Sequence, residues 1–329
     1  MAGSGAIGER DEKELALTAA REAEDAANVA RREVEHFSER LNSSTVLLAS
    51  GQAHADSQRW PDAYTAYTDA TQKLPEYFLV WLERGRLNAK LGRWNAAAAD
   101  FARAVRIGCP IEQAELSGVP QLLFYAGEPE AYATLCEQLS RGPNDDPMAV
   151  EIRGRLVGDL APPDAAELAN RVDRMLAAAQ GGADDKSPHR FGKTRHAYTS
   201  MYHGVNLYVA GWAHLRAGDN ERALARLEES NDARWFGRGI ASPLIAIAHH
   251  RLGNADAALQ AFEQSQALFD RQVDECVREF RSFPSIPWID WIEFLLHRRE
   301  ASIVVKGHTP AADQRLQQIE QLAEAVVAE

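Results

Sequence analysis

The chain has 329 residues, of which 45% are hydrophobic and 8% aromatic, which is enough apolar material for a substantial core of closely packed helices. Its 36 basic and 48 acidic residues give a formal net charge of −12. This balance argues against nucleic acid or an anionic membrane as the main partner, because both require a cationic face.

The sequence also predicts a reducing, intracellular setting. Its three cysteines, Cys109, Cys136 and Cys276, are far apart and form no CxxC pair, so they predict reduced core thiols rather than disulfides or a metal site. The first thirty residues contain no apolar leader segment, and no run of 18 apolar residues occurs in the chain. We therefore expect a cytoplasmic protein without a membrane segment.

Residues 1–44 predict a disordered tip followed by one long helix. Residues 1–9 are small and polar, whereas residues 11–41 contain no Gly or Pro and are rich in Ala, Glu and Arg. Apolar residues recur in this helix at alternating spacings of three and four, namely Ala20, Ala23, Ala27, Ala30, Val34, Phe37 and Leu41. This seam either packs against the first repeat, which its small alanines favour, or joins two copies of the chain as a homodimer.

Residues 45–110 contain a repeat with a period of 34. The first copy consists of Leu47, Gly51, Ala63, Tyr67, Ala70 and Pro75, and the second of Trp81, Gly85, Ala97, Phe101, Ala104 and Cys109. This period with small residues at these offsets is the tetratricopeptide (TPR) signature, a helix–turn–helix unit that stacks on its neighbours. The glycine and alanine positions predict where the two helices of each unit approach most closely.

The rest of the chain predicts further helical hairpins of less regular length. Residues 111–180 read as degenerate repeats, residues 181–200 as a loop or joint between two lobes, and residues 201–305 as TPR-like units. Residues 306–329 predict a helix that caps the end of the stack. Together the segments predict an all-α protein, a right-handed α-solenoid of about six hairpins with a long N-terminal helix and a C-terminal capping helix.

Several stretches resemble one particular bacterial module. The segments AGWAHLRAGDNERALARLEES (210–230), IAIAHHRLGNADAALQAFEQS (245–265), PWIDWIEFLLHRREA (287–301) and FYAGEPEAYATLCEQL (124–139) look like repeats found C-terminal to serine/threonine kinase domains in large planctomycete-type proteins. The resemblance covers residues 45–305 and implies a regulatory or scaffolding region. The chain departs from that pattern because it has no HRD or DFG triplet, so no kinase activity is expected of it.

TPR stacks bind peptides or partner helices in a concave groove, which predicts a non-catalytic interaction scaffold or adaptor in bacterial signalling. First-helix residues that point away from the hairpin contacts are the candidates for this groove, namely His54, Asn88 and Lys90. The sequence contains no P-loop, HExxH or Ser-His-Asp motif. We expect no enzymatic activity, no cofactor and no metal, and a protein or peptide as partner.

Two other clusters could carry binding. Residues 189–203 gather cationic and aromatic side chains, including Arg190, Lys193, Arg195 and His196, that form either an anion or ligand site of a sensor or enzyme, or a solvated loop entering a helix. The segment ARWFGRG (233–239) places Trp235 and Phe236 between two arginines, as a protein hot spot or as a loop anchored to the core.

Overall fold

A computed structural model describes residues 5–110, 116–140, 149–158, 164–181, 195–233, 235–279 and 286–328. These residues are almost entirely helical and contain no strand, which confirms the all-α prediction. They divide into two compact units, Met1–Glu76 and Tyr77–Glu329. The division falls between the two regular repeats, whereas the sequence predicts a joint at residues 181–200.

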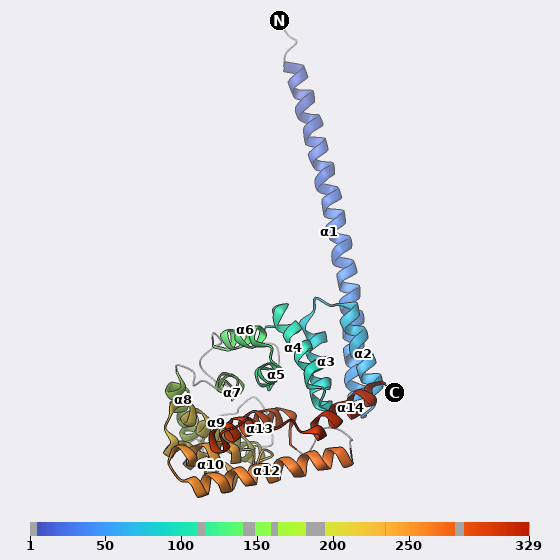
Figure 1. The fold of residues 1–329 in the computed structure, drawn as a ribbon. Coiled ribbons are helices and arrows are strands. Elements are labelled where there is room, and N and C mark those ends of the chain that lie inside the picture. The colour runs from blue at the N-terminus through green and yellow to red at the C-terminus, as the bar shows by residue number, and fades with distance from the viewer. Residues whose placement is uncertain are drawn as a thin grey trace. The chain divides into compact units, whose positions relative to one another are not determined.

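The first unit is a hairpin of two helices. Helix α1 spans Gly5–Asp56, and α2 spans Trp60–Lys73 (Figure 1). The long helix therefore does not end near Leu41, because no proline interrupts the chain before the turn at residues 57–59 and Gly51 is accommodated inside the helix. It supplies the first helix of the first repeat, and it includes residues 5–9, which were expected to be disordered.

The N-terminal part of α1 is uncovered. Every residue of the predicted seam from Ala20 to Phe37 is exposed, and only Leu41 at the end of the seam is half-buried. The favoured interpretation, in which this seam packs against the first repeat, is therefore wrong. Helix α2 has 14 residues against 52 in α1, so it covers only the C-terminal end of α1.

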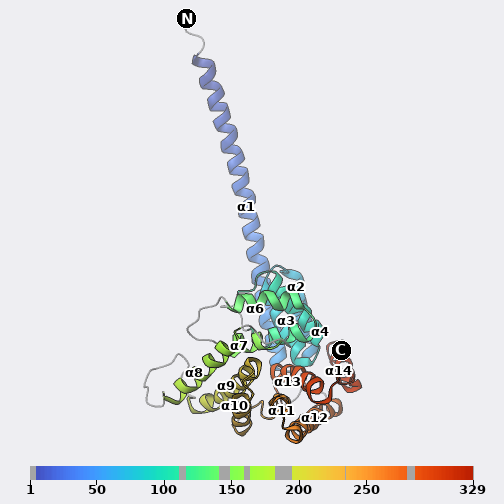
Figure 2. The same cartoon turned by 60° about the vertical axis from the view of Figure 1, so that its left-hand side comes forward.

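The second unit consists mainly of helices packed as consecutive pairs, as the repeats predict. The helices are α3 (Phe78–Leu91), α4 (Trp94–Arg106), α5 (Val119–Tyr125), α6 (Pro129–Ser140), α7 (Ala149–Leu156), α8 (Ala165–Gly181), α9 (Arg195–Ala217), α10 (Asn220–Asp232), α11 (Ser242–Arg251) and α12 (Ala255–Arg278). Helices α9 and α10 form one antiparallel hairpin and α11 and α12 another, and α8 lies alongside α9 (Figure 2).

Three further elements complete the second unit. Helix α13 spans Trp288–Ala301, a π-helical turn covers Ser302–Lys306, and α14 spans Gln314–Ala328. One expected boundary differs, because helix α9 begins at Arg195 within the predicted loop. The α-helical hydrogen bonding of α13 gives way to the π turn after Ala301.

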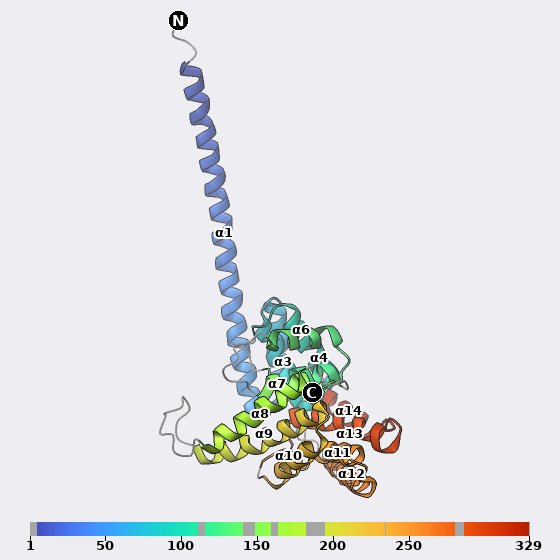
Figure 3. The same cartoon turned by 90° about the vertical axis from the view of Figure 1, so that its left-hand side faces the viewer.

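Helix α13 lies inside the second unit rather than at its end. It packs against α5 and also against α11, which is labelled beside it in Figure 3. It also reaches residues of α4, α7 and α9. Trp291, Ile292 and Phe294 are fully buried on it. In an open solenoid each repeat contacts only its neighbours. These contacts cross the stack, so the finer prediction of an open right-handed superhelix is not confirmed.

Candidate interaction sites

A buried cluster of charged and polar side chains links α13 to two other helices in the interior of the second unit. Arg153 of α7 makes a forked ion pair with Glu293 of α13, with Nε–Oε1 2.8 Å and Nη2–Oε2 2.6 Å, and Nη2 also contacts Asp290. Gln121 of α5 donates a hydrogen bond to Glu293 at 2.6 Å. Burial raises the pKa of Glu293, against the lowering effect of Arg153. Because Glu293 has no exposed surface, this cluster joins α5, α7 and α13 inside the core.

A second ion pair holds the C-terminal end of α13. Arg216 of α9 pairs with Glu300 through both guanidinium Nη atoms and donates to the carbonyl oxygen of Leu156 at 3.1 Å. His297 lies one turn earlier, edge-on to Trp212 with ring centroids 4.4 Å apart. Helix α13 is thus an integral part of the core, and the inner face near it is occupied by the chain itself.

Asn88, a predicted groove residue, lies in the interface between α3 and α4. It is 1% exposed, donates to Asp100 Oδ2 at 3.0 Å and accepts from Arg93 Nη1 at 2.6 Å. Arg84 pairs with the same carboxylate at 2.6 Å. Burial raises the pKa of Asp100, and hydrogen bonds from Arg84 and Asn88 oppose the shift. Asn88 therefore does not line an open groove, because its polar atoms are satisfied inside the hairpin.

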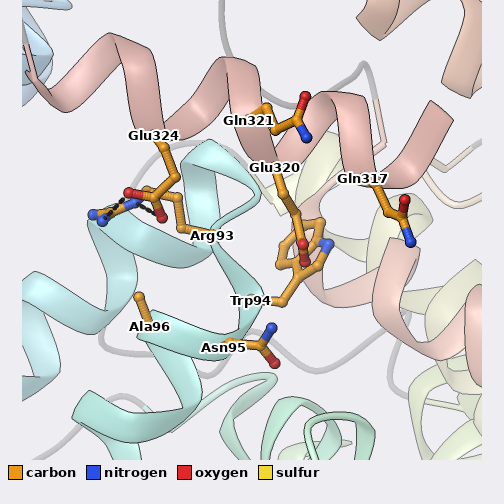
Figure 4. Close-up of a pocket in the computed structure, with 8 residues that line it drawn as sticks. All are labelled: Arg93, Trp94, Asn95, Ala96, Gln317, Glu320, Gln321 and Glu324. Carbon is orange, nitrogen blue, oxygen red and sulfur yellow. Dashed lines mark hydrogen bonds and ion pairs between the residues drawn. The ribbon is translucent and has the colours of Figure 1, made fainter. Parts of the chain in front are cut away.

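A cavity of about 360 Å³ lies where the start of α4 faces α14. Arg93 forms a forked ion pair with Glu324 of α14, and Glu320 extends toward Trp94 (Figure 4). Burial, and then the charge of Glu324, raises the pKa of Glu320. The Arg93–Glu324 ion pair joins α14 to the first hairpin of the second unit. The cavity therefore lies beside a contact that stabilises the fold.

The other predicted groove residues have different positions. His54 is half-buried near the end of α1, with Nδ1 3.6 Å from Asp62 of α2. Lys90 is exposed at the end of α3. His54 and Lys90 belong to separate units, and Asn88 is buried, so the structure does not bring the three together into one described surface.

The cationic cluster at residues 189–203 lies mainly outside the described residues. Arg190 and Lys193 fall in the segment 182–194, and Arg195 and His196 belong to the first turn of α9, where only the backbone is described. The ligand-sensor or enzyme hypothesis for this cluster stays a prediction.

Trp235 anchors the turn between the hairpins α9–α10 and α11–α12. Its indole is 9% exposed and donates to the carbonyl oxygen of Ser230 at 3.0 Å. Gly204 and Gly237 both lie against the ring, because a Cβ on either would come within 2.4 Å of it. The anchor interpretation is therefore the correct one for Trp235.

Phe236 lies next to this anchor and points outward. Its side chain is 68% exposed, whereas most large apolar residues of the second unit are buried. The turn is further fixed by Gly239, whose amide donates to Asn231 Oδ1 at 3.3 Å and whose φ of 95° favours glycine. Arg238 is also exposed. A fixed turn thus presents an exposed aromatic side chain two residues before an exposed arginine, an arrangement we call the Phe236 turn (residues 235–239).

The cysteines have no disulfide partner. Burial raises the pKa of Cys109 to about 11 and that of Cys276 to about 12, so both remain protonated at neutral pH. Among the helices that the structure describes, none combines the length and apolar character that a bilayer span requires.

No protein-family model matches this chain, and no curated protein matches it. The resemblance to TPR repeats and to the kinase-associated bacterial module therefore rests on the residues themselves.

Proposed function

We propose that the protein is a non-catalytic protein–protein interaction scaffold of stacked TPR-like hairpins, acting in bacterial signalling or regulation. The observation that carries the proposal is the Phe236 turn. An aromatic side chain on a fixed turn can be buried by a partner with little loss of conformational entropy, and aromatic and Arg side chains dominate binding energy at interfaces. The partner would offer an apolar pocket flanked by a carboxylate that faces Arg238.

The binding site proposed here differs from the groove that the sequence favours. Helix α13 and the cluster around Arg153 fill the interior of the second unit, and Asn88 is buried between two helices. The Phe236 turn instead lies at the connection between hairpins, where side chains can be exposed without opening the core.

The experiment compares Phe236→Ser with Ile303→Ser. Both remove an exposed apolar side chain, 68% and 46% exposed respectively, so neither should disturb the core. Proteins captured from the native cells by wild-type chain are identified, and binding of the purified partner is then measured by calorimetry. Phe236→Ser should weaken binding about thirtyfold, as expected of a hot-spot residue, and Ile303→Ser should not. Equal affinities for the three proteins would refute this site.

A further inference from the structure

The apolar stripe of α1 continues beyond the part that α2 covers. Toward the C-terminus its members Leu48, Gly51 and Ala55 are buried, as is the polar Ser44 at the same spacing, and Gly51 lies against the ring of Tyr67 in α2. The same spacing of three and four leads back to six exposed residues, which we call the α1 stripe, namely Ala20, Ala23, Ala27, Ala30, Val34 and Phe37. A face that already serves as a helix–helix interface is therefore left uncovered over about five turns.

This uncovered face carries large hydrophobic side chains that are exposed. Val34 is 67% exposed and Phe37 is 44% exposed, and α1 carries most of the exposed large hydrophobic side chains among the described residues. Exposed apolar patches of this kind mark interaction sites. Helix α2 shows what such a partner does on this face, because its Tyr67 ring packs on the small residue Gly51.

The sizes of the stripe residues favour one orientation. The N-terminal members are all alanine, whereas the two largest side chains are at the C-terminal end. A parallel pair would place Phe37 against Phe37 and alanine against alanine, so the helix separation would vary along the coil. An antiparallel pair centred between residues 28 and 29 places Phe37 on Ala20, Val34 on Ala23 and Ala27 on Ala30. Every layer then contains an alanine, and the separation stays even.

The charges beside the stripe favour the same orientation. Glu24 and Arg31 both directly follow a stripe residue, Ala23 and Ala30, so they flank the same edge of the seam. In the antiparallel arrangement Glu24 of one copy faces Arg31 of the other, and symmetry makes this pair twice. In a parallel pair the same two residues would face Ala19 and Ala26, with no charge to meet.

We propose that two copies of this chain pair through the α1 stripe as an antiparallel two-stranded coil. The proposal goes beyond the function above and does not depend on it. Such a dimer places the two α1–α2 hairpins at opposite ends of the coil and carries two copies of the Phe236 turn. A multivalent partner would then bind with increased avidity.

The first test measures the mass of the full-length protein by sedimentation equilibrium. Wild-type chain should be a dimer, and Val34→Glu with Phe37→Glu should be a monomer, because the change places charges in the seam. The matched control is Val29→Glu, at a position 54% exposed but outside the stripe, and it should stay dimeric. A monomeric wild-type chain would overturn the proposal, as would a double variant that still dimerises.

The second test determines orientation and separates pairing from folding. Glu24→Arg and Arg31→Glu should each raise the dimer dissociation constant about tenfold, because each places like charges in two symmetric contacts. Combined in one chain, the two reversals should restore wild-type dissociation. A variant that simply fails to fold cannot be rescued by a second charge reversal. Failure of the combined variant to recover would overturn the antiparallel arrangement.

Discussion

The ring of Phe101 lies directly against Gly85, at a point where a Cβ would come within 2.6 Å of the ring. The two residues are 16 apart and belong to the two helices of one hairpin. The same relationship joins Gly51 to Tyr67. Glycine is needed at these positions because the aromatic ring of the second helix occupies the space that a Cβ on the first helix would fill.

Substitution of Gly85 tests this packing. Gly85→Ala should lower the free energy of unfolding by about 1–3 kcal/mol, the usual cost of overpacking a core, despite the higher helix propensity of alanine. Phe101→Leu should recover part of the loss when it is combined with Gly85→Ala, because it frees space beside the new methyl group. Chemical denaturation followed by circular dichroism gives these values. A gain in stability from Gly85→Ala alone would contradict the close contact.

Substitution of Asn88 distinguishes a buried structural residue from a groove residue. Asn88→Ala leaves Asp100 without one donor and Arg93 without one acceptor, so we expect a loss of about 1–3 kcal/mol. Lys90→Ala, at the exposed position two residues later, should change stability by about 0.5 kcal/mol or less. Denaturation curves of both variants provide the comparison. Equally small losses in the free energy of unfolding at the two positions would show that the hydrogen bonds of Asn88 do not stabilise the hairpin.

The hairpins could be predicted from sequence because their contacts are local and repeat. Gly51 and Gly85 share their offsets to an aromatic ring, so the 34-residue period reports the packing directly. The interior position of α13 could not be predicted in this way. Arg153 and Glu293 are 140 residues apart, and Gln121 and Glu293 are 172 apart, so no local spacing links them.

Burial of polar residues was the other feature that the sequence did not reveal. Asn88 and Glu293 are residue types that are usually exposed, and each is buried only because partners from other helices satisfy it. For Trp235 the sequence left two interpretations open, a hot spot and a loop anchored to the core. The contact of its ring with Gly204 favours the anchor, and that contact is not local in sequence.

The buried ion pair of Arg153 should be far more sensitive than an exposed one. Arg153→Met leaves Asp290 and Glu293 as buried carboxylates without their cation, and we expect a loss of about 3–5 kcal/mol. The matched control is Arg315→Met, because Arg315 also contacts several carboxylates, yet its side chain is 31% exposed. That change should cost about 1 kcal/mol or less. Urea denaturation of the two variants decides the point, and equal losses would contradict the structural role of the cluster.

Buried His297 should make the stability of the second unit depend on pH. Burial, and then the charges of Arg216 and Arg153, lower its pKa well below the ordinary value of 6.5. Its contribution to stability is therefore complete above pH 6.5 and is lost as the pH falls, because the unfolded chain takes up a proton that the folded chain excludes. The free energy of unfolding should decrease by up to about 1.4 kcal/mol for each pH unit below 6.5, until the folded pKa is reached. His297→Phe and His297→Gln should both remove this part of the slope between pH 7 and 5, whatever their absolute stabilities. Parallel pH profiles for wild type and both variants would show that His297 is not held neutral in the folded protein.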